Sequence, residues 1–285
     1  MKNLKLPTMA LALLCMLVSC QKENETPDTD PTAEKEQLVQ ESPLEITEDI
    51  VRLLKENYFN VGSIEVIDFV LPDGSTEQRY QIEDDITFSR AQIESLKTLE
   101  KATSRNYHTN NLVSPRTLSI IGYTGGSYGL SSKERTALQW AVNNYNRLNL
   151  SIRFNLTYGT NYQNKDMVVY YNPNASGSGG SAGFPSNGNP NKFIQIYGLD
   201  DSSTNVNEHV ITHEMGHSVG FRHTDWFSRQ SCGQNVNEGV GSIGANPIPG
   251  TPAGYDPTSV MLACFSSNED GEFNSNDVIA LNYLY

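Results

Sequence analysis

The chain has 285 residues and a formal net charge of −13, because 33 aspartates and glutamates outnumber 20 lysines and arginines. This length suits one large domain or two modest ones. Nucleic-acid binding needs clustered lysine and arginine side chains to neutralise phosphates, so the acidic balance argues against a nucleic-acid partner.

The first residues have the pattern of an export signal. Two lysines precede an apolar stretch that is too short to cross a bilayer as a permanent helix. The stretch ends in Leu17-Val18-Ser19-Cys20, which resembles the bacterial lipobox. We therefore predict a lipoprotein signal peptide over residues 1–19 and a lipid on Cys20. An ordinary signal peptide that leaves Cys20 free is the alternative.

A lipid on Cys20 predicts where the protein works. Acyl chains would hold it in the bacterial cell envelope, on the periplasmic face of the outer membrane or at the cell surface. The lipid is the only membrane contact that we predict, because no later segment is apolar enough to span a bilayer.

Two further segments precede the largest part of the chain. Residues 20–43 are rich in Glu, Asp, Thr, Gln and Pro, which predicts an acidic, disordered tether. Residues 44–115 are expected to form a small α+β unit followed by a polar linker around Arg105. Its predicted elements are helices at residues 46–58 and 91–102 and strands at residues 64–71 and 78–88.

Residues 116–285 carry an alternation of strands with a helix. The predicted elements are strands at residues 117–123, 152–157, 167–171 and 193–197, and a helix at residues 133–148 with Ser132 as its cap. A strand–helix–strand order implies a sheet with at least one parallel pair. A Gly/Ser/Asn-rich loop, Asn172–Asn191, separates the last two predicted strands.

The most specific pattern is His-Glu-Met-Gly-His-Ser-Val-Gly-Phe-Arg-His at residues 213–223. On a helix, His213 and His217 lie one turn apart on one face, so two imidazole nitrogens can reach a single Zn²⁺. His223 would lie too far along a continuous helix, but Gly220 permits the positive φ that ends a helix and turns the chain back. We predict that these three histidines bind Zn²⁺.

Glu214 lies beside the helical histidines and is the predicted general base. It would take a proton from metal-activated water and pass the proton to the leaving amine. A helix with merely structural histidines is the alternative, but it leaves unexplained why four of the five histidines fall between His209 and His223. His209 shares the face of His213, and we predict that it is a residue of the first helical turn rather than a ligand.

Two cysteines remain for the folded part of the chain. Cys15 would leave with the signal peptide and Cys20 would carry lipid, so Cys232 and Cys264 are left. In an oxidising compartment such a pair suggests one disulfide, and two reduced, buried thiols are the alternative.

The histidine motif resembles that of the metzincin metallopeptidases, and His-Glu-x-Gly-His followed by Gly-Phe-Arg-His-Thr-Asp is similar to the dual-action HEIGH metallopeptidase group. For residues 116–285 the resemblance implies a metzincin-like α+β catalytic domain. Such a domain has a twisted mixed sheet with an antiparallel edge strand, an active-site helix, a Met-turn and a C-terminal helix. It also implies that residues 44–115 are a propeptide-like domain.

Several residue roles are implied by this resemblance. Met261, in Ser259-Val260-Met261, corresponds to the Met-turn methionine, and Ser181–Phe184 to the edge strand that pairs antiparallel with substrate. HEIGH-type relatives have an acid-x-Asp-Ile run ahead of the catalytic domain, and the aspartate of this run corresponds to Asp85. We predict that Asp85 binds the zinc in a latent form. An acidic loop that only keeps the N-terminal unit soluble is the alternative. Asp225, two residues after the last histidine, would either anchor its loop or orient a histidine.

The sequence therefore predicts a zinc-dependent endopeptidase that hydrolyses internal bonds of peptide or protein substrates, made as a zymogen. We expect a monomer. A non-catalytic cell-surface binding module on the same fold is the alternative, and the intact Glu214 argues against it.

Overall fold

The structure is a computed structural model that describes residues 42–56, 59, 61–82, 84–96, 108–238, 245–246, 248–252 and 254–285. The predicted signal peptide, Cys20 and the predicted tether up to residue 41 lie outside the described residues, as does Arg105 of the predicted linker. No helix within the described ranges is both long and apolar enough to cross a membrane.

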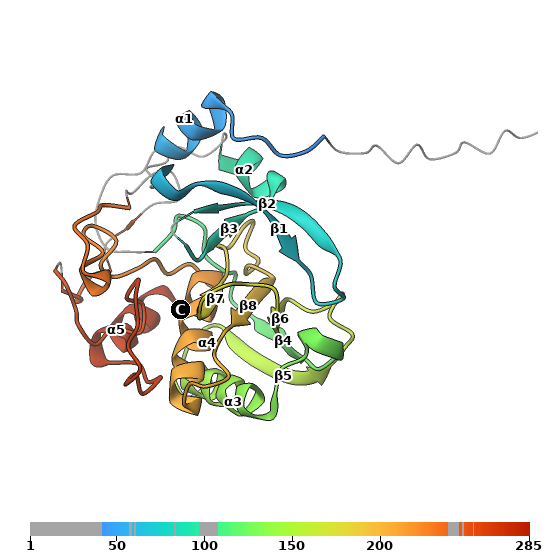
Figure 1. Ribbon diagram of the computed structural model, residues 1–285. Coiled ribbons are helices and arrows are strands. Elements are labelled where there is room, and N and C mark those ends of the chain that lie inside the picture. Colours follow the sequence, from blue (N-terminus) through green and yellow to red (C-terminus); the bar gives the residue numbers. More distant parts are fainter. Residues whose placement is uncertain are drawn as a thin grey trace, which may run out of the picture. The chain divides into compact units, whose positions relative to one another are not determined.

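The C-terminal part is built on a twisted, mixed five-stranded sheet with the strand order β5-β4-β6-β8-β7 (Figure 1). Its strands are β4 (Thr117–Tyr123), β5 (Arg153–Gly159), β6 (Met167–Tyr171), β7 (Gly179–Ser181) and β8 (Phe193–Tyr197). Four strands run parallel, whereas β7 runs antiparallel to β8 at the edge. This is the mixed sheet that the sequence predicts, and three of the four predicted strands have their predicted bounds.

Strand β7 lies in the stretch Asn172–Asn191, which the sequence predicts to be a loop. That prediction is wrong for the three residues of β7, because they pair with β8. Their sequence is Gly-Gly-Ser, which has no alternating apolar side chains and a low strand propensity. Backbone pairing alone therefore creates this strand, and no side-chain pattern could reveal it.

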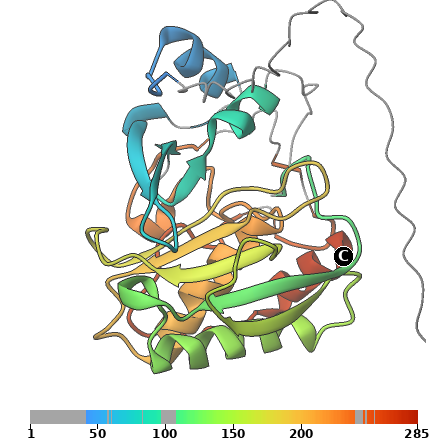
Figure 2. The same ribbon diagram turned by 90° about the vertical axis from the view of Figure 1, so that its right-hand side faces the viewer.

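Two long helices, α3 (Ser132–Asn146) and α4 (Thr204–Ser218), pack against each other beneath one face of the sheet (Figure 2). Helix α3 begins with a capping box at Ser131 and not at the predicted Ser132: Ser131 Oγ accepts from the Glu134 amide, and the Glu134 carboxylate accepts from the Ser131 amide. Both serines are competent caps, but only Ser131 has a glutamate three residues later.

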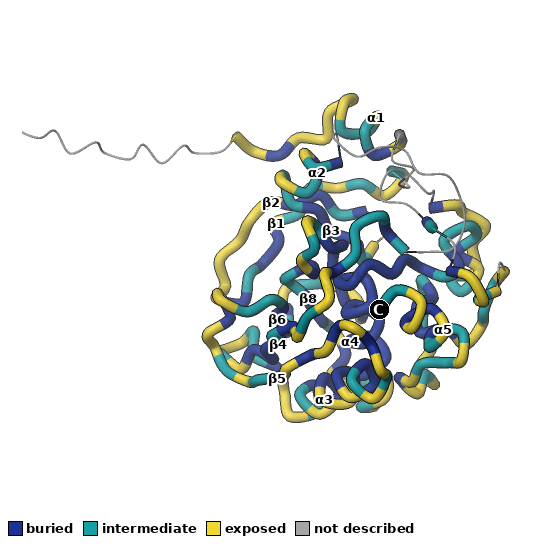
Figure 3. The backbone as a smooth tube through the Cα atoms, turned by 180° about the vertical axis from the view of Figure 1, so that it is seen from behind, coloured by how far each residue is buried: buried dark blue, intermediate teal, exposed yellow. Residues whose placement is uncertain are grey.

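The main hydrophobic core lies between the sheet and these helices. It takes apolar side chains from β4, β6 and β8 above and from α3 and α4 below. Helix α4 is buried along its length, whereas the outer side of α3 faces solvent (Figure 3). The short helices η2 (Gly126–Tyr128) and η3 (Gln230–Cys232) lie in connections, and α5 (Ser275–Leu284) ends the chain.

The N-terminal part forms a three-stranded antiparallel sheet with the order β1-β2-β3. Its elements are α1 (Glu48–Glu56), η1 (Val61–Ser63), β1 (Glu65–Val70), β2 (Thr76–Ile82), β3 (Ile86–Phe88) and α2 (Arg90–Leu96). The single strand predicted for residues 78–88 is wrong, because the chain turns at Asp84 and returns as β3. Asp84 has a φ of 71°, a left-handed conformation that aspartate tolerates better than most residues.

The three-stranded sheet covers the face of the five-stranded sheet opposite α3 and α4 (Figure 2). Arg79 of β2 lies with its Cζ 5.2 Å from the centre of the Phe193 ring on β8. The Tyr170 hydroxyl of β6 donates to the Val70 carbonyl oxygen of β1 at 2.7 Å. Ile86 of β3 pairs with Ala182, the residue that follows the edge strand β7.

Candidate metal centre

Helix α4 runs through the middle of the molecule and carries His213 and His217, the first two histidines of the motif. Its N-terminus is capped by Ser203, whose side chain accepts from the Val206 amide. Every residue from Val206 to Ser218 is buried. His209 lies in the second turn and not, as predicted, in the first. A helix that is enclosed on all sides gives His213 and His217 fixed positions.

Gly220 ends the helix and redirects the chain. Its φ is +110°, and a Cβ there would lie 3.0 Å from the side chains of Leu112 and Thr109. The chain then turns back, so that His223 Nε2 lies 3.2 Å from His217 Nε2. Ligand atoms of Asp85 and the three histidines all lie within 4.8 Å of one another.

The partners of the three Nδ1 atoms determine which nitrogens are available to a metal. His213 Nδ1 donates to the Val260 carbonyl oxygen at 2.9 Å, and His217 Nδ1 donates to the Phe221 carbonyl oxygen at 2.8 Å. His223 Nδ1 lies 2.8 Å from Glu238 Oε1. With hydrogens on Nδ1, the Nε2 lone pairs point to one place, as metal-binding histidines require.

The electrostatics of this cluster call for a cation. Burial lowers the pKa of His217 to about 4, which keeps this imidazole neutral. Burial also opposes the charge on His223, yet the Glu238 and Asp85 carboxylates raise its pKa above the usual value. The raised pKa favours a proton on His223 Nε2 that points to Asp85, and a cation at the place where the Nε2 atoms converge would replace this proton. The donor set fits Zn²⁺.

Glu214 lies beside this cluster under the edge strand. A Cβ on Gly180 of β7 would lie 2.6 Å from Glu214 Cγ, so only glycine leaves room for the carboxylate. Glu214 Oε2 is buried and has no hydrogen-bond partner among the described residues. Burial, and then the Asp85 carboxylate, raise the pKa of Glu214 well above the usual value.

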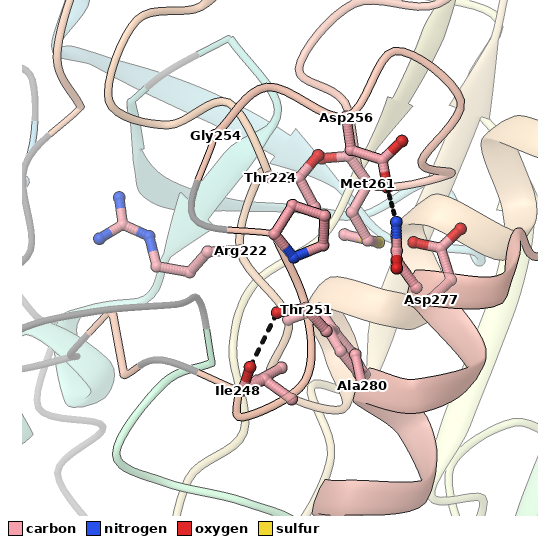
Figure 4. A pocket seen from close by; sticks show the side chains of 12 residues that line it. Arg222, Thr224, Ile248, Thr251, Gly254, Asp256, Met261, Asp277 and Ala280 are labelled. Atoms are coloured by element: carbon pink, nitrogen blue, oxygen red, sulfur yellow. Dashed lines mark hydrogen bonds between the residues drawn. The ribbon is translucent and has the colours of Figure 1, made fainter.

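Met261 lies directly beneath the histidine helix. A Cβ on Gly216 would lie 2.4 Å from Met261 Sδ, so the glycine of the His-Glu-Met-Gly-His motif permits this close approach. Asp277 of α5 holds the turn, because its carboxylate accepts from Ser259 Oγ at 2.7 Å and from the Val260 amide at 3.0 Å. Met261 and Asp277 also line a cavity of about 40 Å³ between this turn and α5 (Figure 4).

Asp225 anchors its loop and does not contact a histidine in the described structure. Its carboxylate accepts from the Ala263 amide at 3.0 Å and from the amide and hydroxyl of Ser231. The group that orients His223 is Glu238, which the sequence did not reveal. No spacing rule links a loop glutamate to a histidine fifteen residues earlier, so only the folded chain exposes this pair.

Cys232 and Cys264 form a disulfide with a Cα–Cα distance of 5.2 Å. The bond joins the loop after His223 to the segment after Met261. The same two segments are also joined by Asp225, so the loop that carries Arg229 and Glu238 is fixed beside the histidines.

Asp85 enters the cluster from the N-terminal part of the chain. Its Oδ2 lies 2.9 Å from His223 Nε2, 3.6 Å from His213 Nε2 and 3.8 Å from His217 Nε2. Burial disfavours its charge, but the three histidines together lower its pKa well below the usual value. Asp85 is therefore a carboxylate at the position where the histidine nitrogens converge.

The backbone around Asp85 also occupies the edge of the five-stranded sheet. The Ala182 amide donates to the Asp85 carbonyl oxygen at 3.0 Å, and the Thr87 amide donates to the Ala182 carbonyl oxygen at 2.8 Å. The two segments run parallel. We call residues 84–88 the blocking segment, because they cover the edge next to Glu214.

A mixed sheet above a helix that carries converging histidines and a buried glutamate defines a metallopeptidase, which is a hydrolase. The chain belongs to the dual-action HEIGH metallo-peptidase family, whose model matches residues 80–285. The family predicted from the histidine motif is thus confirmed.

The chain is also similar to two solved structures of myroilysin. The first is 17% identical, with a TM-score of 0.39, and the match covers 62% of this chain and 98% of that one. The second is 15% identical, with a TM-score of 0.38, and the match covers 61% and 86%. No curated protein matches the chain.

Proposed function

We propose that this protein is a zinc-dependent endopeptidase in which His213, His217 and His223 hold the metal. The observation that carries this proposal is the convergence of three Nε2 atoms whose Nδ1 atoms each have an acceptor. A zinc ion held there supplies Lewis acidity, which polarises a scissile carbonyl and acidifies water.

Glu214 is the proposed general base. It takes a proton from the attacking water and passes the proton to the leaving amine. Two features support this role: its Oε2 atom has no hydrogen-bond partner in the described part of the chain, and its carboxylate lies in the space that Gly180 of β7 leaves open. Once the blocking segment has left, strand β7 would offer its outer edge to an extended peptide, as internal cleavage of a chain requires.

The test is to compare peptide cleavage by zinc-loaded wild type and zinc-loaded Glu214→Gln, both cut between α2 and β4 so that residues 84–88 can leave the histidines. We expect the variant to keep its zinc and to lose about 10²–10⁴-fold in rate, the usual size of a general acid–base contribution. Glu208→Gln is a matched control on the same helix, because Glu208 contacts Asn144 and not the histidines. Equal rates for Glu214→Gln and the wild type would exclude this role. A wild type that binds zinc and cleaves no peptide would favour the non-catalytic binding module.

We further propose that residues 44–115 are an inhibitory propeptide and that Asp85 is the ligand that keeps the metal latent. An aspartate oxygen binds Zn²⁺ at about 2.0–2.2 Å. The side chain of Asp85 is only 15% exposed and lies among the histidines, so it adds little to solubility. The burial of Phe184 among N-terminal core residues also supports the proposal, because Phe184 follows the edge that substrate would use.

Export as a lipoprotein with lipid on Cys20 remains a proposal that rests on the lipobox-like sequence. Labelled palmitate should enter the wild type and not Cys20→Ala. Labelling of both proteins, or of neither, would contradict it.

A further inference from the structure

A pocket of about 370 Å³ opens beside the metal centre. Its wall is formed by the start of β7, by residues of α4 that include Glu214, by the segment after Met261 and by Arg229, and Asp84 and Asp85 of the blocking segment also line it. We propose that this pocket binds an acidic side chain of the substrate through Arg229, at the residue that follows the scissile bond. The proposal rests on the proposed peptidase function and names its substrate class.

Arg229 is a buried cation at the pocket wall. Its side chain is 5% exposed, and its Nη2 lies 3.3 Å from Asp84 Oδ2. Its Nη1 lies 3.5 Å from Glu238 Oε1, an atom that also accepts from His223. A buried guanidinium needs carboxylate neighbours, and arginine is well suited to bind them.

The Asp84 carboxylate lies at the pocket and pairs with Arg229, although its side chain is 74% exposed. Asp84 precedes the proposed latency ligand and belongs to the blocking segment, which must leave the cleft before a substrate can enter. Its departure takes a carboxylate away from Arg229 Nη2. An aspartate or glutamate of the substrate restores that charge pair, whereas an amide or a methyl group does not.

The direction of the strands assigns the pocket to one side of the scissile bond. The blocking segment runs parallel to the edge at Ala182, and the pocket lies toward Ser178–Gly180, where β7 begins. Antiparallel pairing is slightly more stable per residue than parallel pairing, so a substrate strand would add antiparallel to this edge, entering at Ala182 and leaving toward Ser178. The pocket therefore receives the residue on the C-terminal side of the bond that faces the metal.

Two other features of the pocket suit an acidic side chain. His209 lines the pocket, and its buried Nε2 has no hydrogen-bond partner among the described residues. The backbone that carries Arg229 is held by the Cys232–Cys264 disulfide and by a 2.7 Å hydrogen bond from the Arg229 amide to the Asp225 carbonyl oxygen. A fixed guanidinium gains selectivity because little ordering is needed on binding.

The experiment uses zinc-loaded protein cut between α2 and β4. The substrates are C-terminally amidated peptides that differ only in the residue after the cleaved bond, which is Asp, Asn, Glu or Gln. We expect the wild type to cleave the Asp or Glu peptide with a kcat/KM at least about tenfold above that of its amide counterpart. Arg229→Leu should bring this ratio close to one, Arg229→Lys should keep part of it, and the surface control Arg147→Leu should keep all of it.

A binding measurement covers the case in which Arg229→Leu fails to fold. Fluorescence anisotropy on the cut, zinc-loaded Glu214→Gln variant compares the same peptides without turnover, and we expect the Asp or Glu peptide to bind at least about tenfold more tightly. Equal cleavage and equal binding of the acid and amide peptides would overturn the inference, as would a preference that survives in folded Arg229→Leu. If no peptide is cleaved at all, the proposed function fails, and the binding ratio still decides the pocket's preference.

Discussion

Among the residues outside the histidine motif, Glu238 is the one that we expect to affect metal binding most. It lies fully buried between His223, Arg222 and Arg229, and its Oε1 accepts from His223 Nδ1 at 2.8 Å. A carboxylate behind an imidazole fixes the ring and makes its other nitrogen a better ligand. The third histidine, which comes from a loop and not from α4, depends most on such support.

We therefore predict that Glu238→Gln lowers zinc affinity by about 10–100-fold, because the amide keeps the shape but loses the charge behind His223. Competition with a chromogenic chelator measures this affinity. Glu272→Gln, an exposed glutamate paired with Arg147, is the control and should bind zinc as the wild type does. Unchanged affinity in Glu238→Gln would mean that the glutamate does not support the metal.

The histidines and Glu214 could be predicted because their spacing is local: one helical turn and one glycine determine it. Asp85 could be predicted only through a resemblance, because it is 138 residues from the histidine that it contacts. Glu238 and Arg229 could not be predicted, because a loop held by the disulfide positions them.

Among the strands, too, some could be predicted from the local sequence and others could not. The interior strands β4, β6 and β8 are rich in β-branched and aromatic side chains, so their bounds could be read from the sequence. Strand β7 is Gly-Gly-Ser, and the turn before β3 depends on the left-handed conformation of Asp84, so neither left a pattern. These two elements are also the ones that meet at the candidate site.

For the blocking segment we predict latency. Uncut, zinc-loaded protein should cleave peptides at least about tenfold more slowly than protein cut between α2 and β4, because Asp85 and the backbone beside it cover the metal and the edge strand. Asp85→Ala should raise the activity of the uncut protein. Initial rates on one peptide, with equal zinc content confirmed for all forms, provide the measurement.

Asp84→Asn is the neighbouring control: it keeps the metal ligand and suits the left-handed backbone, and it loses only the charge that faces Arg229. It should leave the uncut protein mostly latent. If the uncut wild type is as active as the cut form, the protein is not latent. If cutting activates the protein and Asp85→Ala has no effect, residues 44–115 are still an inhibitory propeptide, but a group other than Asp85 binds the zinc.

At the scale of the whole molecule, residues Ser42–Tyr285 form one compact unit in which the two sheets share a boundary. The N-terminal core cluster includes Phe184 from the C-terminal part, and the Tyr170 hydroxyl donates to β1. The predicted mixed sheet and α+β class are confirmed, whereas the packing of one sheet on the other follows from contacts far apart in sequence.

The disulfide should stabilise this unit. It closes a loop with a sequence separation of 32 residues, and such a loop contributes about 3–4 kcal/mol in the entropic model of the unfolded chain. We predict that the double variant Cys232→Ser and Cys264→Ser loses free energy of unfolding in this range. Urea denaturation of the two proteins measures the difference, with the reduced wild type as control. Equal midpoints, or two free thiols in the non-reduced wild type, would contradict this prediction.

Three histidines are proposed to hold one zinc ion, and a zinc-bound crystal structure of the intact chain would show whether they do. We expect one zinc per chain, with the Nε2 atoms of His213, His217 and His223 at about 2.0–2.1 Å from the metal. Anomalous scattering at the zinc edge identifies the ion. A site occupied by zinc from which His223 points away would contradict the claim.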